Sequence, residues 1–348
     1  MSKPPIPAWR VLRDLSFLLL LGLGVYLILP QIATLEHSLE VVKGMIWWAV
    51  AVAIGAQVSS YVGSGVLLQA IAAMTRDRLS VMRATLIVTA SYSVGLVVGG
   101  MVGSGAATYR WMRGSGTGPE SALLAGWLPA VVYDGALLFV AIFGLLYLLI
   151  VHQLTAPQAL GFGLIFLILS ALAAAILWGT HHRLKLANLA IRLAGRWAAL
   201  RRRPYGPAPT QASVSRLFDA WDRLGHGGLR GPALGAALNT VFDMLTLYFV
   251  FIAAGHRVSP EVLLAGYGLP LLLGRAPLLP GGVGIVESSM AAIYAGLGVP
   301  KDIAVVVVLI YRFISFWLPT LGGFALIPYL QYVASGVDRK PTQVGDRQ

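Results

Sequence analysis

The sequence predicts an all-α polytopic integral membrane protein with about six full spans, two glycine-broken re-entrant hairpins and an inverted repeat. First, 57% of its 348 residues are hydrophobic and only 11% are charged, which is typical of helical membrane proteins. Second, long apolar runs recur along the chain. Third, one run in each half is interrupted by a cluster of glycines, and each glycine weakens a helix.

Composition also narrows the function. The chain has no cysteine, which excludes disulfides, thiol catalysis, iron–sulfur clusters and cysteine-ligated zinc. The net charge of +12 indicates basic cytoplasmic loops that meet anionic headgroups. Nucleic-acid binding is the other interpretation of this charge, and no recognition motif supports it. We therefore expect membrane lipids as partners, no nucleic acid and no cofactor, and the sequence leaves a homo-oligomer open.

The N-terminal spans come first. The apolar run Leu15 to Pro30 follows a basic start, and no small-residue cleavage site follows it, so we expect an uncleaved helix. A second span is expected from Met45 to Ala73, with Trp47 and Trp48 in an interfacial belt. It carries a face of small residues suited to close helix packing, namely Ser59, Ser60, Gly63, Ser64 and Gly65.

The first glycine break lies within the run Met82 to Gly118. Its break residues are Gly99, Gly100 and Gly103, and Arg110 and Arg113 follow. Further spans are expected from Ser121 to Val151, with Pro129 and Asp134 inside it, and from Pro157 to Gly179.

A long polar region separates the halves. Thr180 to Arg230 holds ten basic and two acidic residues, a balance of +8. Within it, Leu186 to Leu200 places Arg192 and Arg196 at helical spacing among apolar residues, which predicts an amphipathic helix on the membrane surface. We expect a single membrane domain, made of half A (1–179), this cytoplasmic loop (180–231), half B (232–336) and a basic tail (337–348).

The C-terminal half contains the second break. A span from Pro232 to Ala254 has Asp243 at its centre, and a broken segment from Pro260 to Pro300 follows. That segment contains Arg275, the break residues Pro280, Gly281, Gly282 and Gly284, and then Glu287. The last span runs from Asp302 to about Ala334, carries Arg312, and is expected to bend at Pro319 and Gly322-Gly323.

Charge then fixes the expected topology. With the basic N-terminus inside, full crossing by every apolar run would put the +8 loop outside. The conflict disappears if Met82 to Gly118 enters and leaves from the cytoplasmic side. The same treatment of Pro260 to Pro300, from the outer side, places both termini in the cytoplasm. Two broken segments of opposite orientation indicate an inverted-repeat transporter with a site near the midplane.

Several motifs resemble a known family. They are Ala253-Ala254-Gly255, Leu279-Pro280-Gly281-Gly282-Val283-Gly284-Ile285-Val286-Glu287, Tyr311-Arg312 and Phe316-Trp317-Leu318-Pro319. This pattern is similar to the lysylphosphatidylglycerol synthase transmembrane region, also called the flippase-like domain family, as in the N-terminal part of multiple peptide resistance factor. The resemblance implies a bacterial inner-membrane or archaeal protein that moves lipids between leaflets, and we expect a multi-pass protein of the bacterial inner membrane.

The chain departs from that family in two ways. It ends at Gln348, so we expect no aminoacyl-transferase domain and no lysylphosphatidylglycerol synthesis. In addition, members often carry an acidic residue at the first break, whereas Gly99-Gly100 has no matching carboxylate.

The candidate site consists of ionisable residues in apolar segments, which are costly in a membrane and are therefore functional candidates. They are Glu287, Arg312, Asp243, Asp134, Arg275 and Arg110. They would line a polar groove for a lipid headgroup, because the planar guanidinium of arginine can bond two phosphate oxygens. The structural alternative is that they pair to hold helices together, and Glu287 is expected to face Arg312.

Two other functions stay open, namely an integral-membrane lipid-modifying enzyme and a lipid-binding scaffold that acts through the basic loop. We find no His-Glu-x-x-His, no Gly-x-Ser-x-Gly and no metal-spaced cluster. No catalytic or metal-binding residue is therefore expected. His181-His182 could bind a metal, but the basic loop around it favours solvation.

Overall fold

The computed structural model describes residues 41–98, 100–152, 154–182, 188, 191–192, 195, 230–275 and 280–337. All regular structure in these residues is helical. The helices are α3 (Trp47–Met74), α4 (Val81–Val97), α5 (Met101–Arg113), α6 (Pro119–Val151), α7 (Ala156–His181), α10 (Arg230–Ala253), α11 (Pro260–Leu273), η2 (Pro280–Gly282), α12 (Ile285–Gly296), α13 (Lys301–Arg312), η3 (Phe313–Trp317) and α14 (Leu318–Val337).

Five segments are long and apolar enough to cross a membrane. They are Trp47–Met74, Pro119–Val151, Ala156–Ala175, Arg230–Ala253 and Lys301–Tyr332. These segments match five of the predicted spans to within a few residues, and they confirm an all-α polytopic membrane fold. The sixth predicted span, Leu15 to Pro30, lies outside the described residues, as does nearly all of the loop from Thr180 to Arg230 with its predicted surface helix.

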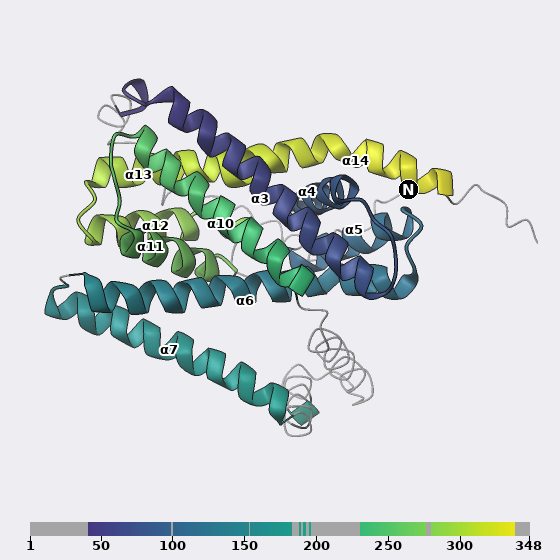
Figure 1. The fold of residues 1–348 in the computed structure, drawn as a ribbon, viewed down its shortest axis with the longest axis horizontal. Helices are drawn as coiled ribbons and strands as arrows, with labels where there is room; N and C mark the ends of the chain where they lie inside the picture. The colour runs from purple at the N-terminus through teal and green to yellow at the C-terminus, as the bar shows by residue number, and fades with distance from the viewer. Residues whose placement is uncertain are drawn as a thin grey trace, which may run out of the picture.

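Helices α3 and α10 form a closely packed antiparallel pair at the centre (Figure 1). A Cβ added to Gly63 would lie 2.5 Å from the backbone nitrogen of Asn239, and one on Gly235 would collide with the backbone of Leu67. The Asn239 side chain donates to Ser60 Oγ at 2.9 Å and to Ser64 Oγ at 2.8 Å. Of the predicted small-residue face of α3, Ser60, Gly63 and Ser64 therefore pack against α10, whereas Gly65 packs against Thr85 of α4.

Each glycine-broken segment folds back on itself as a helical hairpin. In the first, Gly95 packs against Gly100 and Ser104, and Thr108 Oγ1 donates to Ser91 Oγ at 2.8 Å, which brings α4 and α5 together as antiparallel neighbours. In the second, α11 and α12 are held by the hydrogen bond from Tyr294 Oη to the carbonyl of Leu263, at 3.2 Å. Re-entry of these hairpins into a membrane stays a prediction.

The two halves have the same order of elements, namely a long helix, a hairpin and a long helix. The hairpins lie toward opposite ends of the molecule, with α4 and α5 on the right and α11 and α12 on the left of Figure 1. Packing is reciprocal, because α4 contacts α14 while α11 contacts α6. An inverted repeat would produce this order and this reciprocal packing, and the repeat itself stays a prediction.

The last span is irregular at Phe313–Trp317, where a π-helical turn joins α13 to α14. Pro319 has no N–H to donate, so the Ser315 carbonyl one turn earlier loses its helical partner. That carbonyl instead accepts a hydrogen bond from Tyr61 Oη at 3.2 Å. The expected bend at Gly322-Gly323 is wrong in position: α14 continues through both glycines, and Gly323 packs against Thr89 and Ser93 of α4.

Basic residues gather at one end of the molecule. The end of α3, the start of α4 and the end of α5 carry Arg76, Arg78, Arg83, Arg110 and Arg113. The end of α7 and the start of α10, which flank the +8 loop, lie at this same end (Figure 1). By the positive-inside rule we predict that this end is cytoplasmic.

The topology can be tested in a chain that has no native cysteine. Arg78 and Arg257 are both exposed and lie in loops at opposite ends of α3 and α10. In spheroplasts we expect an impermeant thiol reagent to label Arg257→Cys fully and Arg78→Cys only after membrane permeabilisation. The two substitutions remove the same charge, so each is the control for the other. The opposite labelling pattern would reverse the topology, and labelling of both from outside would refute the hairpin arrangement.

Candidate functional site

The two hairpins pack on successive parts of α6. Helix α5 packs on the first half of α6, where Gly105 lies against Gly126. Helix α11 packs on the second half, where Gly268 lies against Ala141. Asp134 lies between these two contact regions of α6, and α4 contacts η2 beside it. The fold therefore places polar residues from both halves at one central junction.

Asp134 and Arg275 form a partly exposed ion pair at this junction. Arg275 Nε lies 3.2 Å from Asp134 Oδ1, and the side chains are 41% and 33% exposed. The contact lacks hydrogen-bond geometry, since Asp134 Oδ1 has no hydrogen-bond partner. The guanidinium also lies 4.8 Å from the ring centroid of Tyr133. Arg275 therefore keeps donor capacity for a further ligand.

Glu287 and Arg312 form a buried ion pair, as predicted. Arg312 Nε donates to Glu287 Oε1 at 2.6 Å, and both side chains are about 5% exposed. Glu287 Oε2 accepts from the Gly284 backbone N–H at 2.6 Å, which caps the start of α12. Arg312 also donates to the carbonyl of Gly281 at 2.9 Å. The pair thus ties the glycine break to α12 and α13.

The break requires glycine on conformational grounds. Gly281, Gly282 and Gly284 have φ values of 68°, 65° and 84°, which side chains with a Cβ rarely adopt. Gly100 has φ 65° at the start of α5, and the first tip closes through backbone contacts such as Gly103 against Val98. The first hairpin therefore needs no carboxylate at its tip. Pro280 begins the turn η2, and Gly99 lies outside the described residues.

Asp243 is buried at the centre of α10 and is held by two tyrosines. Asp243 Oδ2 accepts hydrogen bonds from Tyr267 Oη of α11 at 2.8 Å and from Tyr311 Oη of α13 at 2.7 Å. The Gln57 side chain of α3 lies beside the same carboxylate. Asp243 therefore joins helices from both halves.

Sequence reasoning missed the tyrosines that connect these groups. Tyr133 interacts with both Arg275 and Tyr267, and so links the exposed pair to Asp243. The rings of Tyr61 and Tyr92 pack edge to face at 6.5 Å between centroids. A signal was present, because Tyr133 directly precedes Asp134 and Tyr311 directly precedes Arg312.

Arg110 does not join this cluster. It lies exposed in the last turn of α5, at the basic end of the molecule. Of the six predicted groove residues, the structure therefore brings five to the central region and leaves Arg110 near the expected membrane surface.

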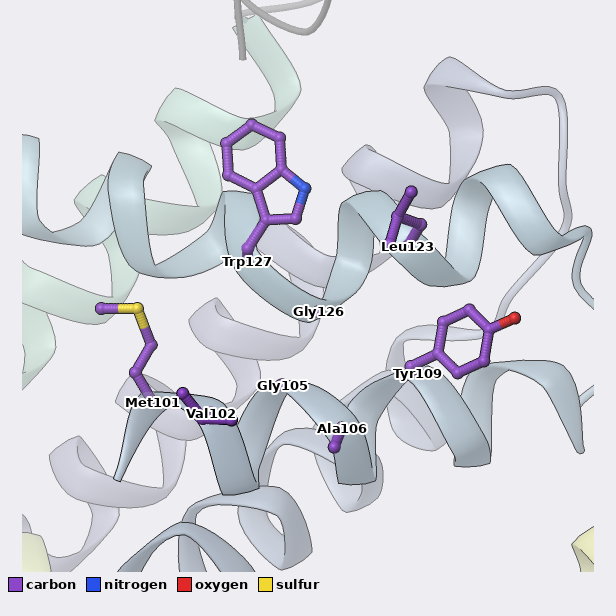
Figure 2. Close-up of a pocket in the computed structure, with 8 residues that line it drawn as sticks. All are labelled: Met101, Val102, Gly105, Ala106, Tyr109, Leu123, Gly126 and Trp127. Carbon is purple, nitrogen blue, oxygen red and sulfur yellow. The ribbon is translucent and has the colours of Figure 1, made fainter. Parts of the chain in front are cut away.

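An apolar groove of about 500 Å³ lies between α5 and α6 (Figure 2). Gly105 and Gly126 face each other across its floor, because neither has a side chain to separate the helices. The groove is lined by Met101, Val102, Gly105, Ala106, Tyr109, Leu123, Gly126 and Trp127. The groove opens at the surface of the protein, because Met101, Val102 and Leu123 are exposed.

The groove and Asp134 lie on the same face of α6. Leu123, Trp127 and Asp134 fall on one face of this helix, because residues 4, 7 and 11 positions apart nearly coincide in angle. Asp134 lies about 10 Å beyond Trp127 at the helical rise of 1.5 Å per residue.

Fold and site together define a multi-pass helical membrane protein with two helical hairpins and a buried polar cluster. The family model of the lysylphosphatidylglycerol synthase TM region matches residues 15–323, and the chain belongs to this family. Membership of this family is consistent with a membrane lipid-related role.

Curated relatives are similar over a short region. A UPF0104 membrane protein of Methanothermobacter thermautotrophicus is 35% identical over 89 residues, or 26% of each chain. One from Pyrococcus horikoshii is 36% identical over 85 residues, which are 24% of this chain and 25% of that protein. The match thus covers about a quarter of their length. Both organisms are archaea, so placement in a bacterial inner membrane stays a prediction.

Proposed function

We propose that the protein translocates phosphate-bearing lipids between membrane leaflets, with the headgroup passing the central polar cluster and an acyl chain in the α5–α6 groove. The observation that carries this proposal is an open apolar groove on the same face of α6 as the partly exposed Asp134–Arg275 pair, which lies about 10 Å further along the helix. An amphipathic lipid needs both surfaces at once. An enzyme acting on lipids would also need an activated nucleophile, a base or a metal.

The geometry favours Arg275 over Arg312 as the headgroup contact. Arg312 is buried and already bonded to Glu287 and Gly281, so a phosphate would have to displace both. Arg275 is 41% exposed and makes no aligned hydrogen bond to Asp134. A phosphate could therefore bind Arg275 without breaking a buried pair.

Translocation of fluorescently labelled phosphatidylglycerol in reconstituted liposomes tests this proposal. We expect Arg275→Gln to slow translocation at least about tenfold, because hydrogen bonds to charged groups contribute about 1.5–3 kcal/mol. Ala106→Trp should slow it similarly by filling the groove. Thermal stability should change little for both variants, since both positions are exposed or partly exposed.

Two matched variants serve as controls. Arg257→Gln removes an exposed arginine from the α10–α11 loop, and Ala174→Trp adds an indole to the exposed surface of α7; both should translocate at the wild-type rate. Wild-type protein that leaves the lipid distribution unchanged would overturn the proposal. Equal activity of Arg275→Gln and wild type would remove Arg275 from the pathway.

A further inference from the structure

Buried oxygen atoms without hydrogen-bond partners gather around Asp243. They are Gln57 Oε1 on α3, and Asn239 Oδ1 and Thr240 Oγ1 on α10. All four residues are more than nine-tenths buried, with exposures of 4%, 8%, 3% and 7% for Gln57, Asn239, Thr240 and Asp243. Unpartnered buried oxygens are rare in folded proteins and call for an explanation.

These residues lie within about one helical turn of each other along the α3–α10 interface. Asn239 and Thr240 precede Asp243 by four and three positions, which places all three on one side of α10. Across the interface, Thr246 Oγ1 donates to the Ala53 carbonyl at 3.3 Å and Ser60 Oγ donates to the Asn239 carbonyl at 3.0 Å. Gln57 lies between these two contacts of α3, and therefore opposite Asp243.

Asp243 has no basic partner among the described residues that bond to it. It accepts hydrogen bonds from the neutral hydroxyls of Tyr267 and Tyr311, and the neutral amide of Gln57 lies beside it. The groups that face it from each packed element are Tyr61 of α3, Tyr92 of α4, Tyr133 of α6, Tyr267 of α11, and Tyr311 and Arg312 of α13. Arg312 is engaged by Glu287. A buried carboxylate without a cation is costly.

We propose that Asp243, Gln57 and Thr240 form a binding site for a sodium ion between α3 and α10, with Asn239 at its margin. A hard cation takes carboxylate, amide and hydroxyl oxygens as ligands, so one ion would compensate the charge of Asp243 and use the unpartnered oxygens. One carboxylate balances the single charge of a monovalent ion, so no net charge would stay buried. A proton would neutralise Asp243 but would leave several buried oxygens without a partner. A water molecule would give these oxygens a hydrogen-bond partner but would leave the charge of Asp243 uncompensated.

Neither a sequence motif nor a cluster of His, Cys, Asp or Glu side chains marks such a site. The described residues contain no group of three or more His, Cys, Asp or Glu side chains that could hold a metal ion. The proposed site has one acidic ligand and otherwise neutral oxygens on two helices. If the protein translocates lipid as proposed above, bound sodium would link this step to a sodium gradient, because Tyr267 and Tyr311 connect Asp243 to both α11 and α13.

Thermal unfolding of the purified protein in NaCl, KCl or choline chloride at constant ionic strength tests the site without measuring transport. We expect the melting temperature to rise by roughly 2–4 °C per tenfold increase in sodium above the dissociation constant, with no such rise in choline. Asp243→Asn should abolish the response. Asp302→Asn, at the start of α13, should retain it.

Thr240→Val covers the case in which Asp243→Asn does not fold. Its hydroxyl has no partner, so the variant should fold, and it should need at least about tenfold more sodium for half of the response because a ligand is lost. A wild-type protein that responds equally to all three salts would overturn the proposal in favour of buried water. Response to pH alone would overturn it in favour of a proton. Sodium-dependent stabilisation without lipid translocation would refute only the proposed function.

Discussion

Glu287→Gln is expected to lower the free energy of unfolding by about 3–5 kcal/mol, because it leaves Arg312 as a buried charge without its partner. The carboxylate bonds Arg312 Nε at 2.6 Å and the Gly284 N–H at 2.6 Å, and both side chains are buried. Arg312→Gln should cost a similar amount and also free the Gly281 carbonyl. Unfolding in mixed detergent–SDS micelles measures these differences.

The double variant separates a structural pair from a headgroup site. Glu287→Gln combined with Arg312→Gln removes both charges, and we expect it to recover most of the lost stability. A residual loss of about 1–3 kcal/mol should persist, because the Gly281 carbonyl loses its donor. Since the pair is buried and committed to the hairpin tip, lipid translocation should survive in the double variant.

The partly exposed pair is the matched control. Asp134→Asn should cost less than about 1 kcal/mol, since solvent screens a pair whose side chains are 33% and 41% exposed. A stable double variant without translocation would instead assign Glu287 and Arg312 to the headgroup pathway. If both single variants are stable and active, the pair is unimportant for folding stability and for lipid translocation.

Much of the fold was readable from the sequence because membrane constraints are strong. Lipid leaves apolar helices as the main choice for spanning segments, so hydropathy located α3, α6, α7, α10 and α13–α14 to within a few residues. Glycine clusters located the two hairpins, since several of these positions have positive φ. The ion pair between Glu287 and Arg312 was predicted because the two residues have opposite charges and lie in the last hairpin and the span that follows it.

The partners of the other ionisable residues could not be predicted, because they depend on contacts between distant helices. Asp134 meets Arg275 only because α11 packs antiparallel on α6. Asp243 is satisfied by tyrosines 24 and 68 positions away in the chain. The π-turn at Phe313–Trp317 follows from Pro319, but its location upstream of the proline becomes clear only from the backbone pattern.

Gly63→Ala is the substitution expected to disturb the fold most at the centre. The new Cβ would lie 2.5 Å from the Asn239 backbone nitrogen, which is backbone and cannot rotate away. Separation of α3 from α10 would weaken the hydrogen bonds from Asn239 Nδ2 to Ser60 and Ser64, at 2.8–3.0 Å. We expect a loss of about 3 kcal/mol in the free energy of unfolding.

Gly55→Ala on the same helix is expected to have the opposite effect on stability. A Cβ at Gly55 meets no atom within 4 Å, so alanine should stabilise α3 by up to about 1 kcal/mol through its higher helix propensity. Equal effects of Gly55→Ala and Gly63→Ala would show that helix propensity, not close packing, governs both positions. A loss of stability in Gly63→Ala alone would instead establish that the α3–α10 contact requires a residue without a side chain at position 63. The stabilisation by sodium should then also decrease in Gly63→Ala, since the proposed ligands Gln57 and Asp243 come from these two helices.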